Sequence, residues 1–600
     1  MADKLLKRNE VPVAETWDLT LLYKTVEDME KDLEKAGVLA DKIAAFKGKL
    51  NNSQAINDCL SLYEDFSIVT DHVGNYVSLD SETDHTNSVV MERSDRVFNT
   101  LNDYETKISF MDNEIARADV AVLEKAKQES ERHAGYLDDV LRNKPHMLSD
   151  DTEKALTALS QTLYAAYDSY LAAKHADMKF DDFEVDGKKY PLGYSLFEDD
   201  YEYDSRTPVR RAAFKAFSDK IRQYRNVTAT AYNTCVRCEK TLADLRGYDS
   251  VFDYLLFGQK VTRDLYDRQI DLITTKLAPH MRKYARLIKK IHKLDKMTYA
   301  DLKLPIDPDF SPKVTMEEAK EYCVKGLSIL GPEYTKMVEE AFDNRWFDLA
   351  NNEGKCTGGF CASPYQKNSF ILLSFNGRMS DVFTMAHELG HAGHFRACSR
   401  AQSILDTNTS GYFVESPSTM NELLMTHYLL KTSDDKRFKR WVLANMVSNT
   451  YYHNFVTHLL EAAYQREVYK IIEEGGSVQA DTLDDIFKNV LTDFWGEDVE
   501  LTEGAELTWM RQPHYYMGLY SYTYSAGLTI ATEVCDRIER EGAPAVEDWK
   551  RGLAMGGKLD PLGFAKNAGV DISTDAPLLH TIELIGNYID EICKLTEELG

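Results

Sequence analysis

The chain has 600 residues, of which 43% are hydrophobic and 28% charged, and its formal net charge is −27. This composition is ordinary for a globular protein with a sizeable core, and the acidic balance argues against nucleic acid, which requires a basic face. No apolar run approaches the roughly 18 residues of a membrane helix, and the opening MADKLLKRNE does not resemble a signal peptide. We therefore expect a cytoplasmic protein that binds neither nucleic acid nor membrane; the oligomeric state is left open.

The first region, residues 1–115, is predicted to be an antiparallel helical bundle. Proline is absent between Pro12 and Pro145, which permits long helices. Apolar side chains recur at helical spacing after Thr25, a residue type that caps helix N-termini. These are Met29, Leu33, Ala36, Ile43 and Phe46.

A connecting region, residues 116–200, is predicted to be helical with one hairpin. In MKFDDFEVDGKKYPL, Asp186 and Gly187 stand between two half-alternating segments, as in a turn of the primed type. Residues 201–600 return to a helical pattern and form the predicted catalytic domain. Within it Cys235 and Cys238 make a lone CxxC, whose flanks favour an ordinary helix over a redox or half-zinc site.

The segment from 351 to 375 changes character. Residues 351–369 are rich in glycine and small side chains, and SFILLSF then predicts a buried strand from Phe370 to Phe375. The strongest motif of the chain follows on a predicted helix. It is HExxH, formed by His387, Glu388 and His391.

HExxH is the zinc motif of many peptidases. Positions i and i+4 of a helix lie on one face, so His387 and His391 can bind one Zn²⁺. Glu388 lies beside the metal and can act as the general base toward zinc-bound water. The alternative is an amphipathic helix with surface histidines, but the apolar flank Phe383, Met385 and Ala386 indicates a buried helix.

A catalytic zinc requires a third protein ligand. The metzincin pattern would place a histidine at position 397, where the chain has Ala397. Glu415 and Glu422 are seven residues apart and share a helical face, so we expect Glu415 to bind zinc and Glu422 to hydrogen-bond a ligand imidazole. The alternative is a pair of surface acids.

Two further groups of polar residues are candidates for the site. His394 follows His391 by one turn and either supports a ligand or is structural. In RQPHYYMGLYSYTYS, phenol and imidazole donors crowd together and can stabilise an oxyanion. The alternative, an aromatic core stripe, is favoured for Tyr515, Tyr516 and Tyr520.

Three separated segments, HELGH, FVESPSTMNE and PHYYMGLYSYTYSAG, resemble oligoendopeptidase F, one of the thimet-oligopeptidase-like zinc peptidases. VPVAETWDLTLLYK and GKCTGGFC are also similar, so the resemblance runs nearly end to end. It implies a mainly α fold: a large, two-lobed helical metallopeptidase with a small β-sheet beside the HExxH helix and a deep substrate channel.

The resemblance also implies which residues act. One zinc is held by His387, His391 and Glu415, Glu388 is catalytic, and His514 with Tyr522 or Tyr524 donates to the transition state. We expect the substrate to be bound by Gly358, Gly359, Phe360, Ser374 and Tyr520. The loop departs from the family in KCTGGFC, and the effect of Cys356 and Cys361 is left open.

The predicted function is zinc-dependent hydrolysis of internal bonds in short, unfolded peptides, with the peptide antiparallel along Phe370–Phe375. One alternative is a peptidyl-dipeptidase of the same fold, which trims dipeptides from chain ends. A second is a non-catalytic peptide-binding protein with the same channel, against which the presence of Glu388 argues.

Overall fold

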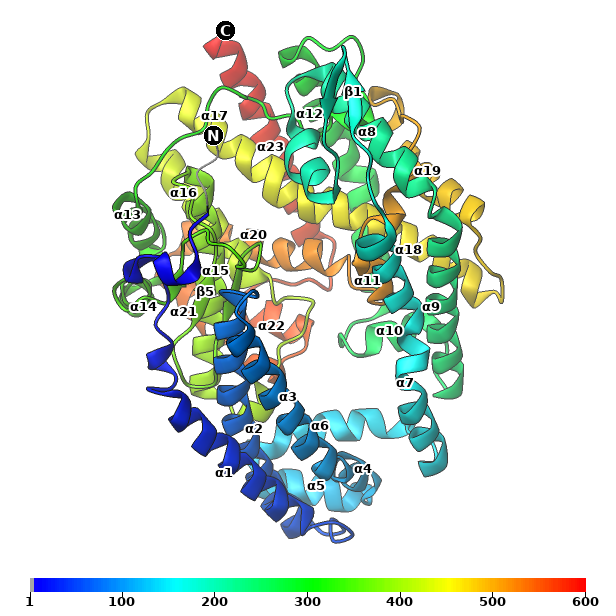
Figure 1. Ribbon diagram of the computed structural model, residues 1–600, viewed down its shortest axis with the longest axis vertical. Helices are drawn as coiled ribbons and strands as arrows, with labels where there is room; N and C mark the ends of the chain where they lie inside the picture. Colours follow the sequence, from blue (N-terminus) through cyan, green and yellow to red (C-terminus); the bar gives the residue numbers. More distant parts are fainter. Residues whose placement is uncertain (1–4) are drawn as a thin grey trace.

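The computed structural model describes residues 5–600, and nearly all regular structure in them is helical (Figure 1). The predicted mainly α fold is therefore confirmed. Figure 1 shows α13–α16 and α21 on one side of the molecule and α7–α10, α18 and α19 on the other, with the N-terminal helices across one end. No helix within residues 5–600 is long and apolar enough to cross a membrane.

The N-terminal helices pack as a bundle, as predicted. Thr25 caps the first helix, since its side chain accepts a hydrogen bond of 3.2 Å from the backbone N–H of Asp28. Met29, Ala36 and Ile43 are fully buried, on the face that meets the next two helices. The helices are α1 (Val26–Ala44), α2 (Ser53–Glu82), α3 (Ser88–Ile108), α4 (Phe110–Arg117), α5 (Val120–Glu129) and α6 (Ala134–Asn143).

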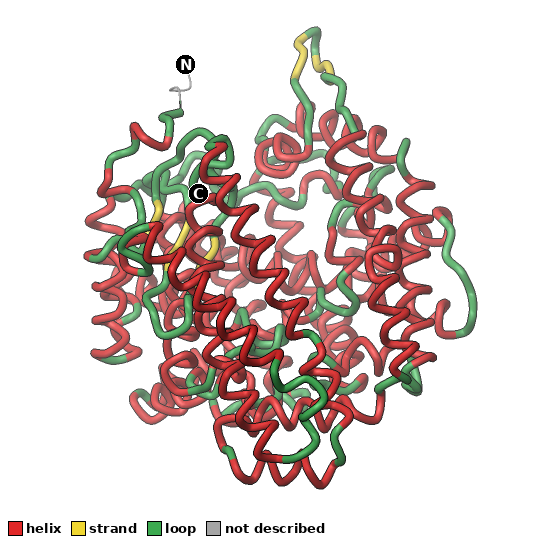
Figure 2. Tube along the Cα trace, turned by 60° about the horizontal axis from the view of Figure 1, so that its bottom comes forward, coloured by secondary structure: helices red, strands yellow, loops and turns green. Residues whose placement is uncertain are grey.

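The connecting region carries the predicted hairpin. Strands β1 (Phe183–Val185) and β2 (Lys188–Tyr190) are antiparallel, and both turn residues have positive φ, +51° at Asp186 and +76° at Gly187, as a type I′ turn requires. The hairpin projects at the top of Figure 2. Helix α7 (Asp150–Leu171) precedes the hairpin. The helices that follow it are α8 (Thr207–Arg222), α9 (Arg225–Leu245), α10 (Val251–Phe257), α11 (Arg263–Leu272), α12 (Ala278–Ile291), α13 (Met316–Gly326) and α14 (Pro332–Asp343). The CxxC lies within α9, so its helical interpretation is confirmed.

A second, three-stranded sheet precedes the HExxH helix. Its order is β3 (Phe347–Asp348), β5 (Phe370–Leu372), β4 (Phe360–Ala362), with β3 parallel and β4 antiparallel to β5. Residues alternate between its faces: Ile371 belongs to the large hydrophobic cluster of the catalytic region, whereas Phe370 and Leu372 belong to that of the N-terminal bundle.

The strand predicted over Phe370–Phe375 is shorter, and the substrate position predicted along it is wrong. β5 is the central strand, so its backbone groups already pair with β3 on one side and β4 on the other. Beyond β5, the N–H groups of Leu373 and Phe375 also donate to the β3 side. Of the two edge strands, β3 is flanked by the N-terminal segment, since the N–H of Leu349 donates to the carbonyl of Glu15 at 2.8 Å. Within the described residues, the edge left for a peptide is therefore that of β4.

The remaining helices complete the catalytic region. The HExxH helix packs against the helix that follows it and against β4. These helices are α15 (Met379–Ala401), α16 (Ser416–Thr432), α17 (Lys436–Asn445), α18 (His458–Glu473), α19 (Ala480–Trp495), α20 (Thr523–Glu541), α21 (Ala543–Leu553), α22 (Pro561–Asn567) and α23 (Ala576–Leu599).

A buried ion-pair network fixes the sheet. The carboxylate of Asp348, fully buried in β3, accepts from Arg8 at 3.0 Å and lies 2.8 Å from Nζ of Lys355. Lys355 also donates to the backbone carbonyls of Asp348, Ala350 and Leu373 at 2.7–3.0 Å. The network therefore ties the N-terminal segment and the glycine-rich loop to the strands.

Replacement of Asp348 by alanine should cost about 3–5 kcal/mol in the free energy of unfolding, because the Lys355 charge would stay buried without its partner. The matched control is Asp343→Ala, which breaks an exposed pair with Lys320 and should cost about 0–1 kcal/mol. Urea denaturation of both variants gives the comparison. Equal losses would contradict the role assigned to the network.

Candidate active site

The site depends on a close contact between α15 and α16. A Cβ at Gly390, inside HELGH, would lie 2.3 Å from the carbonyl oxygen of Pro417, so only glycine lets the first turn of α16 approach so near. Pro417 suits this turn because its ring fixes a helical φ. The amide of Asn421 then donates to the carbonyl of Ala386 at 2.9 Å. The start of α16 is thus fixed beside the histidines of α15.

This contact brings the three predicted metal ligands together. The Nε2 atoms of His387 and His391 lie 3.4 and 3.3 Å from the same oxygen, Oε2, of Glu415. One ligand atom from each of the three residues lies within 4.8 Å of the others. Burial opposes ionisation of Glu415, but the hydrogen bonds from both histidines hold its pKa well below the usual value. The donor set of two imidazoles and one carboxylate fits a zinc ion.

Neighbouring side chains orient these donors. Nδ1 of His387 lies 2.7 Å from Oε1 of Glu422, which leaves Nε2 facing Glu415. Thr450 donates to the other oxygen of Glu422, and Ser418 donates to Oε2 of Glu415 at 2.8 Å. The ligand groups are therefore held in their orientations by a second layer of hydrogen bonds.

Glu388 belongs to α15, and its side chain faces the glycine-rich loop. Its side chain is buried, and its Oε2 atom has no hydrogen-bond partner among the described residues. Burial raises the pKa of Glu388, against the effect of His387 and His391. A Cβ at Gly359 would lie 3.4 Å from Oε1 of Glu388, so this loop is the wall of the site next to the carboxylate. Gly358 has φ +88°, and a Cβ at this position would have no atom within 4 Å.

Aromatic and imidazole groups approach from the opposite side. Tyr524 lies over His458 with ring centroids 4.0 Å apart, 5.7 Å from His514 and 5.3 Å from Tyr520. Burial and nearby negative charges raise the pKa of Tyr524, so its phenol stays a donor. A cavity of about 570 Å³ has Tyr524 in its lining together with His387 and Glu415.

Tyr522 does not reach this cavity, which corrects its assignment as an oxyanion donor. Its side chain is fully buried, its hydroxyl donates to Gln259, and its ring packs on Tyr266 with centroids 4.9 Å apart. The reason is helical geometry: Tyr524 lies in the first turn of α20, and residues two apart in a helix point in nearly opposite directions. Tyr520, for which a core position was favoured, lies beside Tyr524 instead.

The structure gives the surroundings of three other candidate residues. His394 is fully buried, and neither ring nitrogen has a hydrogen-bond partner among the described residues, so it supports no ligand through a hydrogen bond. The ring of Phe360 packs near Trp17 at 6.3 Å, toward the N-terminal bundle. Ser374 lies just past β5, where its carbonyl accepts from Asn376.

Glu461, an acidic residue that lies behind His514, was not identified from the sequence. Glu461 is 1% exposed; its Oε2 accepts from Nδ1 of His458 at 2.8 Å and from Ser521 at 3.1 Å, and lies 3.7 Å from Nδ1 of His514. Although burial opposes ionisation, these histidines lower the pKa of Glu461 to about 2. No local pattern indicates this cluster, because Glu461 lies in α18 and only the fold brings it next to His514 and Ser521.

An HExxH helix with a third ligand on the next helix, beside a short sheet, defines a metallopeptidase site. Residues 201–584 match the model of peptidase family M3, and residues 114–180 match that of oligopeptidase F. The chain belongs to peptidase family M3 and is a metalloendopeptidase.

Similar proteins span the whole chain. Oligopeptidase PepF of Bacillus subtilis is 26% identical over 599 residues, which cover 99% of this chain and 89% of that protein. Among solved structures, a Chlamydophila abortus protein assigned to the peptidases superposes with a TM-score of 0.88 at 22% identity, covering 99% and 100% of the two chains. Oligoendopeptidase-F of Enterococcus faecium gives 0.73 at 21%, covering 95% and 99%. At these identities the structural likeness shows the fold.

Replacement of Gly390 by alanine should weaken metal binding by roughly 10–100-fold, as when groups that orient metal ligands are displaced. The added methyl group would meet backbone atoms of Pro417 and Ser418, so α16 and Glu415 must move. The control is Gly258→Ala, which has negative φ and no atom within 4 Å of the added carbon. Metal titration of the two apo-proteins measures the difference; unchanged affinity in Gly390→Ala would contradict it.

Proposed function

We propose that this metalloendopeptidase uses one zinc ion to hydrolyse internal bonds of short, unfolded peptides. The observation that carries the proposal is the convergence of His387, His391 and Glu415 within 4.8 Å, next to the buried carboxylate of Glu388. The similarity to oligopeptidases over the whole chain supports the substrate class.

His387, His391 and Glu415 would hold the zinc and leave one position open. When bound, zinc supplies a Lewis acid and lowers the pKa of water at the site. Glu422 and Ser418 keep the ligand atoms oriented. Two neutral imidazoles and one carboxylate would bring a single negative charge. The zinc ion together with these three ligands would therefore keep a net positive charge toward the peptide carbonyl.

Glu388 is the proposed general base. It takes a proton from the attacking water and later gives this proton to the leaving amine, so atoms and charges balance over the reaction. Its free Oε2 atom has no competing hydrogen bond among the described residues. Gly359 has no side chain between the loop and this carboxylate, which leaves room for the peptide.

Tyr524 and His514 are the proposed donors to the oxyanion, with Tyr520 beside them. Tyr524 lines the same cavity as Glu415, and the charge of Glu415 contributes to the raised pKa of both tyrosines. Glu461 acts behind His514 as a positioning residue, because its carboxylate lies 3.7 Å from Nδ1 of that ring. Donors fixed in this way cost no reorganisation when the negative charge develops.

The peptide would bind by adding a strand to the free edge of β4. Strand addition gives backbone hydrogen bonds that are independent of peptide sequence. The cavity is also lined by Glu198, Tyr203 and Lys303, which come from the other side of the molecule. A site enclosed from two sides admits an extended chain, which rises about 3.3 Å per residue, but not a folded domain.

Glu388→Gln should lower the turnover of a peptide of about ten residues by roughly 10²–10⁴-fold, because the base is lost while the shape is kept. Its zinc content should stay near that of the unchanged protein. Fragments are identified by mass spectrometry and zinc by elemental analysis.

The matched variant is Glu415→Gln, which should lose zinc as well as activity. Equal zinc content in the two variants would contradict the assigned roles. Fragments confined to terminal dipeptides would indicate a peptidyl-dipeptidase, and the absence of fragments from the unchanged protein would indicate a peptide-binding protein.

Tyr524→Phe should lower kcat by about 10²–10³-fold with little change in KM, as expected when one oxyanion donor is removed. Tyr522→Phe is the control, since it loses one buried hydrogen bond outside the cavity and should cost about 1 kcal/mol of stability only. Steady-state kinetics of both variants decide the assignment. A larger kcat loss in Tyr522→Phe would reverse it.

A further inference from the structure

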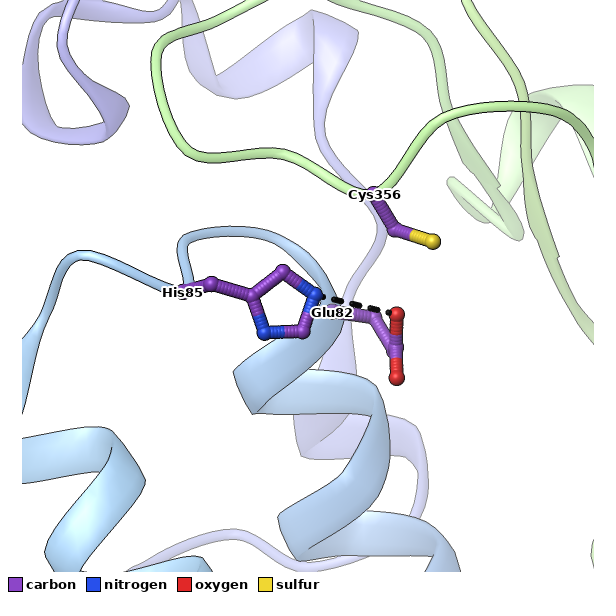
Figure 3. Close-up of side chains that lie close together, drawn as sticks. All are labelled: Glu82, His85 and Cys356. Atoms are coloured by element: carbon purple, nitrogen blue, oxygen red, sulfur yellow. Dashed lines mark ion pairs between the residues drawn. The ribbon is translucent and has the colours of Figure 1, made fainter. Parts of the chain in front are cut away.

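A second group of metal-binding side chains lies outside the active site. Figure 3 shows Glu82, His85 and Cys356 directed toward one another. Glu82 is the last residue of α2, His85 lies in the turn before α3, and Cys356 lies in the loop between β3 and β4. One nitrogen, one oxygen and one sulfur atom of these residues lie within 4.8 Å of each other.

The backbone holds these three side chains together without a metal. The N–H of Cys356 donates to the carbonyl of Glu82 at 2.9 Å, and the N–H of His85 donates to the carbonyl of Gly354 at 2.8 Å. Gly354 has φ +79°, and a Cβ there would lie 2.4 Å from Asp84. The loop therefore lies directly against the end of α2, in a path that requires glycine.

The cysteine and the neighbouring lysine contact different parts of the fold. The side chain of Lys355 is 2% exposed and points into the sheet, where it pairs with Asp348. The next side chain, Cys356, lies at the end of α2, where its sulfur is within 4.8 Å of ligand atoms of Glu82 and His85 (Figure 3). Asn352 is also buried. Its side chain donates to the carbonyl of Thr83 at 2.9 Å and so fixes the beginning of the same loop.

The distance between the histidine and the glutamate suits tetrahedral zinc coordination. Zinc bonds of about 2.0–2.3 Å to nitrogen, oxygen and sulfur place the ligand atoms of a tetrahedron roughly 3.3–3.6 Å apart. Nε2 of His85 already lies 3.4 Å from Oε2 of Glu82. The side chains of His85 and Glu82 are 44% and 28% exposed, so small rotations are free and solvent can supply a fourth ligand.

We propose that Glu82, His85 and Cys356 bind a second divalent cation of the zinc class. A thiolate and an imidazole select borderline metals over Mg²⁺ or Ca²⁺, which prefer oxygen ligands. The site is independent of the peptidase assignment, because it shares no residue with the HExxH centre.

A cation at this site would join two parts of the molecule. Two ligands belong to the N-terminal bundle, and the third lies three residues before Gly359, which borders Glu388. Binding would thus fix the wall of the active site against α2. The physical link is short, since the loop has only Thr357 and Gly358 between these positions.

Cobalt substitution of the full chain tests the proposal. Co²⁺ bound to a thiolate gives an intense charge-transfer absorption in the near ultraviolet, which a centre of two histidines and one glutamate cannot give. The metal-free protein, titrated with Co²⁺, should bind two ions per chain and develop this absorption. Cys356→Ser should bind one ion without the absorption.

Two further variants complete the test. Cys361→Ser removes the other thiol of the same segment and should keep the absorption. His85→Ala, a change at a half-exposed ring, should weaken the second Co²⁺ by at least tenfold. An unchanged protein that takes up one Co²⁺ only, or an absorption that persists in Cys356→Ser, would overturn the proposal.

Discussion

The contact between Gly390 and the first turn of α16 is the constraint on which the rest of the site depends. A catalytic zinc needs a third ligand beyond the two histidines of α15, and the proposed third ligand, Glu415, stands at the start of a different helix. Glycine at position 390 lets two helices meet backbone to backbone. Asn421 then ties the pair with a hydrogen bond to Ala386, so the ligand geometry is set by packing before any metal binds.

Around this contact the molecule arranges two kinds of polar group. Glu422, which holds His387, is partly buried, and both of its oxygens are hydrogen-bonded, one to His387 and one to Thr450. Glu388, the proposed general base, is buried and has one oxygen without a hydrogen-bond partner among the described residues. This difference follows from function: a positioning carboxylate is useful when its hydrogen bonds are filled, whereas a base needs a free lone pair.

The sequence predicts those features that are local in the chain. The spacing of HExxH places His387 and His391 on one helical face, and the Asp186–Gly187 pair specifies its own turn. Features that depend on distant pairing were not predictable. Whether β5 is an edge or a central strand depends on β3 and β4, and the roles of Tyr522 and Tyr524 depend on where α20 begins. The cluster of His458, Glu461 and His514 joins α18 to a segment that is distant in the sequence.

The sheet beside the active site is shared between the two hydrophobic clusters. Ile371 faces the catalytic region, and its neighbours Phe370 and Leu372 face the N-terminal bundle. The bundle is therefore not a separable unit. An enzyme shortened to begin after it would expose to solvent the apolar face of the sheet that borders the active site. A change in the projecting hairpin leaves this shared sheet untouched, whereas removal of the first helices would uncover one of its faces.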